Sequence, residues 1–298
     1  MTDELYGLFR RNFPFAVREE ETARRVLASA DHVIERRADG RLMGAAVTQG
    51  GTILMLCVDE AYRRRGVSSA LLDEAERVLW ADGCREITVG AGSGYLVPGV
   101  PTSKRYYDAV NEALYPGLDE SASRFFEKRG YAHSWDCNCF DMRFPLSECR
   151  APDWEIGQAA NGVIYRWAAP EDRAAVCACV DDAWPDFTQY YREEALYGAD
   201  PARHVMLAEA EGVAAGALMV SLEAEGKGVG SVGCTAVRHA YRGRRIAVNM
   251  VTLSTAFLKT AGMRDAFLGY TYSGLDYMYG LAGYKICVYY MMAKKTLI

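Results

Sequence analysis

The chain has 298 residues, half of them hydrophobic (50%) and about a quarter charged (24%), which predicts a folded protein of about two domains. Its formal net charge of −5 argues against nucleic acid as a partner, because such binding depends on a broad basic surface. No signal-like segment opens the sequence, and the longest apolar stretch, residues 213–222, is too short to cross a bilayer. Nine scattered cysteines predict reduced thiols, so we expect a cytoplasmic protein with no membrane partner.

Helical and strand patterns follow one another in a similar order in the two halves. In the first half we expect two short helices within residues 1–30, a hairpin of 32–37 and 42–47, a strand at 52–58, a helix that ends at Gly83, a strand at 87–92, a helix at 121–129 and strands within 131–143. In the second half we expect a strand at 163–167, a helix at 170–183, strands at 204–210, 215–223 and 230–237, a helix that ends at Gly262 and a strand at 266–271. The predicted class is α+β, with a mixed, mostly antiparallel sheet and flanking helices in each half.

An internal repeat relates the halves at an offset of 179 residues, the distance from Val58 to Val237. The same offset pairs Tyr62 with Tyr241, Arg63 with Arg242, Arg65 with Arg244, Leu79 with Leu258, Gly83 with Gly262, Arg85 with Arg264 and Gly90 with Gly269. No gap is needed from the basic turn to the next strand, so we interpret the chain as a tandem duplication. The predicted domains are residues 1–148 and 160–298, joined by a linker at 149–159.

The first half has an extra segment, residues 95–120, that is rich in proline, glycine and tyrosine. Such an irregular insertion is typical of a lid or binding loop, and the alternative is a surface segment that covers an edge strand. The tyrosines that could line a substrate pocket, or simply pack, are Tyr95, Tyr106 and Tyr107 of this insertion and Tyr190 and Tyr191 of the second half.

The most informative stretch is residues 58–83, where a strand leads through a basic turn, YRRRGVSSA, into an amphipathic helix. Backbone N–H groups at a helix N-terminus with arginines beside them form a site for phosphate oxygens. The ligand could be a mononucleotide, a dinucleotide or coenzyme A. The glycine patterns of P-loops and Rossmann folds are both absent. The closely spaced cysteine pairs at 137/139 and 177/179 do not fit a tetrahedral zinc site, and no metal is expected.

These residues resemble the GCN5-related N-acetyltransferases, whose signature [QR]-x-x-G-x-[GA] opens a helix after an apolar strand. The matching positions are Val58, Tyr62, Arg63, Gly66 and Ser68 in the first half, and Val237, Tyr241, Arg242, Gly243 and Ala247 in the second. Each half also has the Gly-Tyr pair that follows an aromatic helix. The resemblance implies a tandem duplication of an acyl-CoA N-acyltransferase fold, with acetyl-CoA as the bound cofactor.

The resemblance also implies which residues hold acetyl-CoA. The end of the strand would pair with the pantetheine arm, and the turn would hold the pyrophosphate. The implied residues are Leu56, Cys57, Val58, Arg63, Arg64, Arg65, Gly66, Val67, Ser68, Ser69 and Ala70 in the first half, and Ala236, Val237, Arg242, Arg244, Arg245, Ile246, Ala247 and Val248 in the second.

The two halves depart from the family pattern in opposite ways. The position of the family's tyrosine acid is Phe126 in the first half and Tyr279 in the second, so Tyr279 is the implied catalytic residue. The glycine that lets the turn approach the pyrophosphate is Gly66 in the first half but Arg245 in the second. These differences favour the first half for the cofactor, with the second half as a second site or a scaffold.

The implied reaction is direct attack of a small-molecule amine on the thioester, in a protein that is a monomer or homodimer. Asp59 and Asp276 are candidates for the general base, or else ordinary solvated carboxylates. Two alternatives remain open: a catalytically weak acyl-CoA-binding protein, and an acetyltransferase that acts on a protein or peptide.

Overall fold

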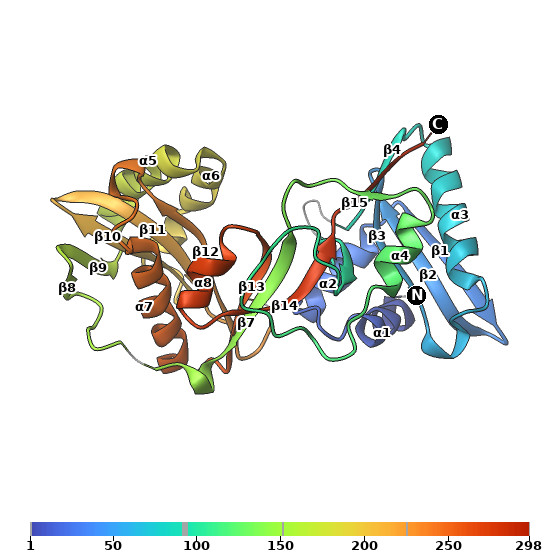
Figure 1. The fold of residues 1–298 in the computed structure, drawn as a ribbon, viewed down its shortest axis with the longest axis horizontal. Coiled ribbons are helices and arrows are strands. Elements are labelled where there is room, and N and C mark those ends of the chain that lie inside the picture. The colour runs from blue at the N-terminus through green and yellow to red at the C-terminus, as the bar shows by residue number, and fades with distance from the viewer. Residues whose placement is uncertain (1, 91–94, 151, 225, 298) are drawn as a thin grey trace. The chain divides into compact units, whose positions relative to one another are not determined.

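The computed structural model describes residues 2–90, 95–150, 152–224 and 226–297, in two compact units (Figure 1). Unit 1 comprises Met1–Asp141, Gly269–Ser273 and Cys287–Ile298, and unit 2 comprises Met142–Leu268 and Gly274–Ile286. The domain boundaries expected from the repeat stay a prediction. Residues 91 and 92 of an expected strand and residue 151 of the expected linker lie outside the described residues.

Unit 1 contains a six-stranded sheet with the strand order β1-β2-β3-β4-β15-β6 among the described residues. Its elements are α1 (Thr2–Asn12), α2 (Glu20–Ala28), β1 (His32–Ala38), β2 (Arg41–Gln49), β3 (Thr52–Val58), α3 (Val67–Ala81), β4 (Glu86–Val89), α4 (Ser121–Glu127), β6 (Ala132–His133) and β15 (Ala293–Thr296). Strands β3 and β4 pair in parallel, and the other recorded pairs of this sheet are antiparallel. The expected helix pair, hairpin, apolar strand and long helix are all confirmed.

A nine-stranded sheet has the order β5-β14-β7-β13-β12-β11-β10-β9-β8, and its strands β7, β13 and β14 have residues in both units. The elements are β5 (Val100–Thr102), β7 (Cys139–Pro145), β8 (Ala159–Ala160), β9 (Val163–Trp167), α5 (Arg173–Ala183), α6 (Thr188–Tyr191), β10 (Arg203–Ala210), β11 (Val213–Ser221), β12 (Val229–Val237), α7 (Ile246–Thr260), β13 (Asp265–Tyr272), α8 (Asp276–Leu281) and β14 (Lys285–Met291). The α+β class with mixed, mostly antiparallel sheets is confirmed.

The C-terminal strand β15 belongs to the sheet of unit 1, although it ends the second repeat. Lys294 pairs with Thr88 of β4, and Ala293 pairs with His133 of β6. In Figure 1 this red strand accordingly lies beside elements from the blue and cyan part of the chain. The strand therefore fills a position between β4 and β6 that the sequence repeat does not predict.

The insertion at residues 95–120 is anchored to unit 1 along its length. Its strand β5 pairs with β14, where Thr102 lies opposite Tyr289, and the N–H of Tyr115 donates to the carbonyl of Cys287 at 2.7 Å. Buried Leu96 and Val97 pack into the same apolar cluster as α1 and α2. The insertion thus covers an edge strand, which was one of the two interpretations that the sequence left open.

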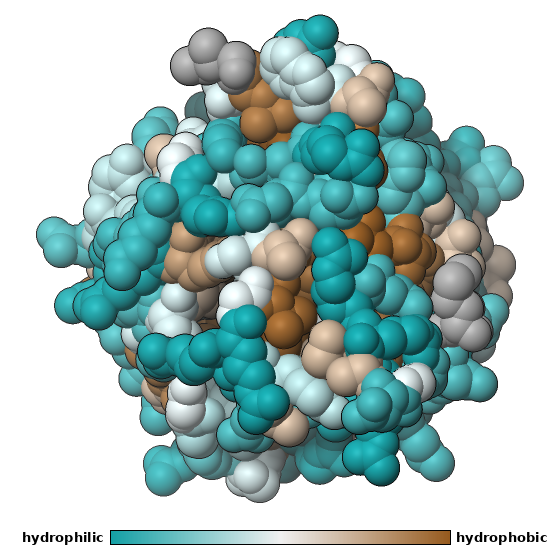
Figure 2. Space-filling view, turned by 90° about the vertical axis from the view of Figure 1, so that its right-hand side faces the viewer, coloured by the Kyte–Doolittle hydropathy of each residue, from teal (hydrophilic) through white to brown (hydrophobic). Residues whose placement is uncertain are grey.

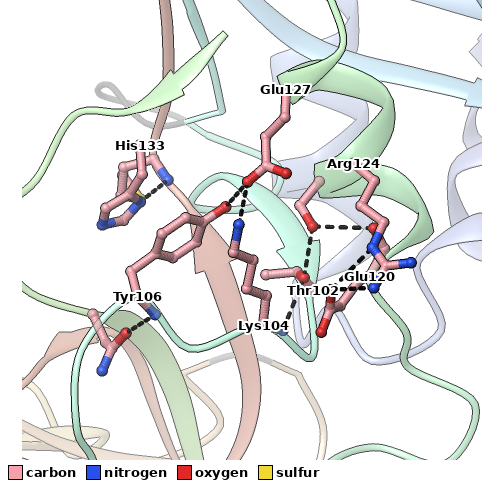
Figure 3. A network of polar contacts seen from close by, with 10 residues as sticks. Thr102, Lys104, Tyr106, Glu120, Arg124, Glu127 and His133 are labelled. Carbon is pink, nitrogen blue, oxygen red and sulfur yellow. Dashed lines mark hydrogen bonds and ion pairs between the residues drawn. The ribbon is translucent and has the colours of Figure 1, made fainter.

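A polar network fixes the middle of the insertion to α4 and β6 (Figure 3). The ammonium group of Lys104 and the hydroxyl of Tyr106 both donate to the Glu127 carboxylate, at 2.6 and 3.0 Å. The Tyr106 ring stacks on His133, with 4.1 Å between ring centroids and 5° between planes. Burial lowers the pKa of His133, and the Met292 N–H donates to its Nδ1, so the ring is neutral with its proton on Nε2. This segment is held like a core element.

The face shown in Figure 2 is mainly hydrophilic, and its hydrophobic areas are small and separated by polar residues. Among the described residues, no helix is long and apolar enough to cross a membrane.

Candidate functional site

The two basic turns adopt the same backbone conformation. In the first turn the left-handed residues are Arg64, with φ of 61°, and Gly66, with φ of 79°. At the matching positions of the second turn are Gly243, with φ of 80°, and Arg245, with φ of 61°. Each turn therefore has two left-handed positions. The glycine is at the second of these positions in the first turn and at the first of them in the second turn. The repeat predicted from sequence is a repeat of local geometry.

One arginine in each turn supports the turn by hydrogen bonds from its guanidinium group to other parts of the protein. The Arg63 guanidinium donates to the carbonyl of Val58 at 3.2 Å and to the side chain of Asn12, at the end of α1, at 2.9 Å. Arg242 donates to the last carbonyl of β12 at 3.2 Å and to the carbonyl of Ala183, at the end of α5, at 3.2 Å. These two predicted cofactor residues join the strand, the turn and the preceding helix.

The start of each helix leaves backbone donors available. The first intrahelical bonds run from the N–H of Ala70 to Gly66 and from the N–H of Asn249 to Arg245, both at 3.0 Å. Within the described part of the chain, no partner is found for the N–H groups of residues 64–69 or 243–248. These groups and the helix dipole favour an anion at this place.

Exposed arginines surround both helix starts. Arg64 and Arg65 are exposed in the first turn, and the Arg65 guanidinium lies 5.8 Å from the Tyr62 ring. In the second turn Arg244 lies 4.9 Å from the Tyr241 ring, and it also forms an exposed ion pair with Glu211 at 3.2 Å. Both turns thus add positive charge to the backbone donors.

The glycine at the N-cap distinguishes the first turn. A Cβ atom built on Gly66 would meet no heavy atom within 4 Å, so the protein itself leaves the space beside this residue open. The matching residue of the second turn, Arg245, already has a side chain there and is exposed. The first turn therefore allows closer approach to its backbone.

The strand that leads to the second turn loses one neighbour before it ends. Among the described residues, β12 pairs with β13 over Val229–Ser231, but with β11 as far as Val237. The end of β12, which contains predicted pantetheine-binding residues, can therefore accept an extended ligand as a further strand. Strand β3 pairs with β2 as far as Val58.

The predicted acid Tyr279 lies beside β12. Its buried hydroxyl is 3.2 Å from the hydroxyl of Thr235. The neighbouring Cys234 has a left-handed φ of 49°, and its carbonyl accepts a 2.7 Å hydrogen bond from Tyr191. In the first half Phe126 stands at the corresponding place on α4 and is buried without a hydroxyl.

Two family models match the chain: the acetyltransferase (GNAT) domain over residues 3–98 and the acetyltransferase (GNAT) family over residues 163–276. The chain belongs to the GNAT family as a tandem member. It is therefore an acyltransferase, and acetyl-CoA is the co-substrate that this family uses. No curated protein matches the chain significantly.

Solved structures share this tandem GNAT fold. The GCN5-related N-acetyltransferase from Sphaerobacter thermophilus is 19% identical over 99% of this chain and 92% of its own, with a TM-score of 0.66. A tandem GNAT protein from the clavulanic acid biosynthesis pathway is 15% identical over 99% and 94%, with a TM-score of 0.63. The glucosamine N-acetyltransferase region of a fungal multi-domain β-N-acetylglucosaminidase is 19% identical, with a TM-score of 0.70. Our chain is covered to 98% in that match but spans only 36% of the fungal protein.

The candidate bases of this GNAT protein are engaged in local structure. Asp59 accepts from Arg11 at 3.1 Å and from the N–H of Ala61 at 3.3 Å, which caps the short helix η1 (Glu60–Tyr62). Asp276 is buried and accepts from the N–H of Gly274 at 2.9 Å. Both contacts are those of structural carboxylates.

The cysteines beside the turns are not prepared as nucleophiles. Burial raises the pKa of Cys57 to about 12 and that of Cys234 to about 11, so both are neutral thiols at pH 7. This agrees with direct transfer to the acceptor. Among the described residues, no group of three histidine, cysteine or acidic side chains could hold a metal.

The tyrosines of the insertion do not gather in one pocket. Tyr106 and Tyr107 lie against His133, whereas Tyr95 lies 5.3 Å from the ring of Tyr270. In the second half, Tyr191 is buried and Tyr190 is exposed.

One buried ionisable group was missed from the sequence. The carboxylate of Asp141 accepts from the Tyr290 hydroxyl at 2.6 Å and from the N–H of Tyr270 at 2.9 Å. Burial raises its pKa to about 6. The only signal for it in the sequence is an acidic residue inside the apolar strand β7.

Proposed function

We propose that this GNAT protein transfers the acetyl group of acetyl-CoA to the amine of a small molecule. The observation that carries the proposal is the repeated turn, in which unpartnered N–H groups of a helix start lie beside exposed arginines. Such a turn suits the pyrophosphate of coenzyme A, and the open end of β12 beside the second turn suits the pantetheine arm.

The residues proposed to hold acetyl-CoA are the turn and strand positions implied by the family resemblance. The open space beside Gly66 fits close approach of the pyrophosphate in the first half. In the second half Arg245 presents a guanidinium at the same position, which can bind phosphate oxygens through its own donors. We infer that Arg63 and Arg242 shape the turns rather than contact phosphate, since both guanidinium groups donate to the protein.

Bound acetyl-CoA supplies an activated thioester, and the amine attacks its carbonyl carbon. A C–N bond forms and the C–S bond breaks, while the amine loses one proton and the thiolate gains one. At pH 7, freeing the lone pair of an amine like that of lysine costs about 4.6 kcal/mol. The departing thiolate needs little acid help because its pKa is about 8.5. We assign the proton donor role to Tyr279, whose hydroxyl lies beside β12 at Thr235.

Positioning can supply much of the remaining acceleration, because holding two reactants in contact is worth about 7–11 kcal/mol. The turn and the open strand end fix one reactant by many backbone contacts. The protein residues then need only to orient the amine and to transfer its proton. A location in the cytoplasm is part of the proposal, supported by nine free cysteines.

Calorimetry with acetyl-CoA and a thiol-release assay test this function together. We expect binding of acetyl-CoA and release of coenzyme A with at least one member of a panel of small amines. Absence of binding would refute the whole proposal. Binding with no acetylation of any amine would favour an acyl-CoA-binding protein, and acetylation of peptides alone would favour a protein acetyltransferase.

A further inference from the structure

Three aromatic side chains lie together on the surface of unit 2, in the segment that follows α5. Trp184 and Tyr190 are 45% and 51% exposed, and Phe187 lies between them. The ring centroids are 6.0 Å apart for Trp184 and Phe187 and 6.3 Å apart for Phe187 and Tyr190. We call this set, Trp184, Phe187 and Tyr190, the aromatic surface.

The residues next in sequence to the aromatic surface contact the basic turn and the strand beside the proposed acid. Trp184 directly follows Ala183, whose carbonyl accepts the hydrogen bond from Arg242 of the turn. At its other end, Tyr190 precedes Tyr191, whose hydroxyl donates to the carbonyl of Cys234. The next residue of β12 is Thr235, the partner of Tyr279. The segment thus connects the two places where the reacting groups are expected.

One carboxylate of this segment is available to a cation. The carboxylate of Asp186 is exposed, and it has no hydrogen bond or ion pair among the described residues. Its neighbours are already used, since Asp182 accepts from the N–H of His239 at 3.0 Å and Asp181 accepts from Thr188 at 3.3 Å. A cation over the face of Trp or Tyr is attracted by the ring, and a nearby carboxylate adds to that attraction.

The matching segment of the first half is closed by the insertion. It follows Asn12, which receives the arginine of its turn as Ala183 does in the second half. Here Phe13 is only 7% exposed, and Phe15 lies 5.8 Å from the ring of Tyr115 of the insertion. The backbone of Tyr115 is in turn fixed to β14. The insertion therefore occupies the place that is open in the second half.

We propose that the amine acceptor first binds as a protonated alkyl amine on the aromatic surface of the second half and releases that proton to solvent before the neutral amine attacks the thioester, while the insertion closes the first half to acceptors. This inference rests on the proposed function. It adds the class of the acceptor and the half of the chain in which the acceptor binds. The second half then binds the reacting acetyl-CoA as well as the amine, transfer takes place beside Tyr279, and the first half is a second acetyl-CoA site or a support.

Tetraethylammonium tests the surface without any chemistry, because this cation cannot be acetylated. Ligand-observed NMR should show its binding to the wild-type protein at a single class of site. Trp184→Ala and Tyr190→Ala should each weaken that binding by about two- to five-fold, as expected for loss of an exposed cation–π contact. The matched control is Trp80→Ala, which removes a tryptophan of similar exposure (43%) from α3. Unchanged binding of tetraethylammonium in Trp184→Ala would refute the proposal that the aromatic surface binds the cation. Two equal sites in the wild type would refute the proposal that the insertion closes the first half.

Kinetics separates this inference from the proposed function. With an amine that the thiol-release assay identifies, Trp184→Ala should raise the KM for the amine and leave the KM for acetyl-CoA unchanged. An unchanged KM for the amine in an active enzyme would refute the inference alone. Failure of every amine, with tetraethylammonium still bound, would refute the function while the cation site stands.

Discussion

Replacing Gly66 with glutamate tests whether the first turn holds the pyrophosphate. Gly66 has a φ of 79°, and a Cβ atom there meets no neighbour within 4 Å. The folding cost is therefore only that of a left-handed side-chain residue, about 1–2 kcal/mol. Arg245 already adopts this conformation in the second turn, so the fold accommodates a side chain at the position.

The effect on binding is electrostatic. A carboxylate about 4 Å from one phosphate charge costs about 1 kcal/mol in water and about 4 kcal/mol at an effective dielectric constant of 20. Gly66 is exposed, so the cost lies within this range, and acetyl-CoA should bind this turn at least about five-fold more weakly. The loss should be smaller at high salt, which screens exposed charges.

Isothermal titration calorimetry with acetyl-CoA measures both affinity and stoichiometry. The matched control is Gly66→Ala, which has the same backbone cost without the charge. We expect Gly66→Ala to weaken one site, because its methyl group enters the space proposed for the pyrophosphate, and Gly66→Glu to weaken that site further or remove it. Wild-type affinity and stoichiometry in Gly66→Glu would refute the assignment of the pyrophosphate to this turn.

Three further predictions concern the acid, the buried carboxyl and the supporting arginines. Tyr279→Phe should lower kcat, by no more than about 100-fold because the thiolate is a good leaving group, and should leave the KM for acetyl-CoA unchanged, because it removes only the hydroxyl beside β12; an unchanged kcat would exclude the tyrosine as proton donor. The folded-state pKa of Asp141, about 6, lies above its ordinary value of 3.8, so its contribution to stability is lost as pH rises from about 4 to 6. The free energy of unfolding of Asp141→Asn, measured with urea and compared with that of the wild type, should therefore rise by up to about 3 kcal/mol between pH 4 and pH 7. A difference between the two proteins that does not change with pH would contradict this. Arg63→Ala should lower the free energy of unfolding by about 1–3 kcal/mol, because it removes two hydrogen bonds of a charged donor. Its control, Arg64→Ala, should change stability by less than about 0.5 kcal/mol, and equal losses would contradict the supporting role.

Local elements could be predicted from the sequence because their determinants are local. Strand β3, helix α3 and the turn between them follow from an apolar run, helical periodicity and a glycine with positive φ. The repeat added the second copy at the same offset, and its backbone angles agree with the first. The family and the α+β class followed from these patterns.

The roles of individual side chains could not be predicted in the same way. Arg63 and Arg64 are adjacent in a basic run and both are exposed, yet only the guanidinium of Arg63 is recorded with a hydrogen bond to the end of α1 among the described residues. The environment of Asp141 likewise depends on Tyr270 and Tyr290, which are more than a hundred residues away in the sequence. Contacts between distant segments determine whether a charged residue supports the fold or meets a ligand.

The sequence by itself determined that two copies of a basic turn exist, because helix starts and left-handed positions are encoded by neighbouring residues. Only the tertiary structure decided that β15 completes the sheet of unit 1 and that the insertion covers β14. Strand pairing of this kind depends on which edges are free once the chain has folded, and no local pattern records it. For the same reason, the exposure of Trp184 and the burial of Phe13 distinguish two halves that the repeat alone makes equivalent.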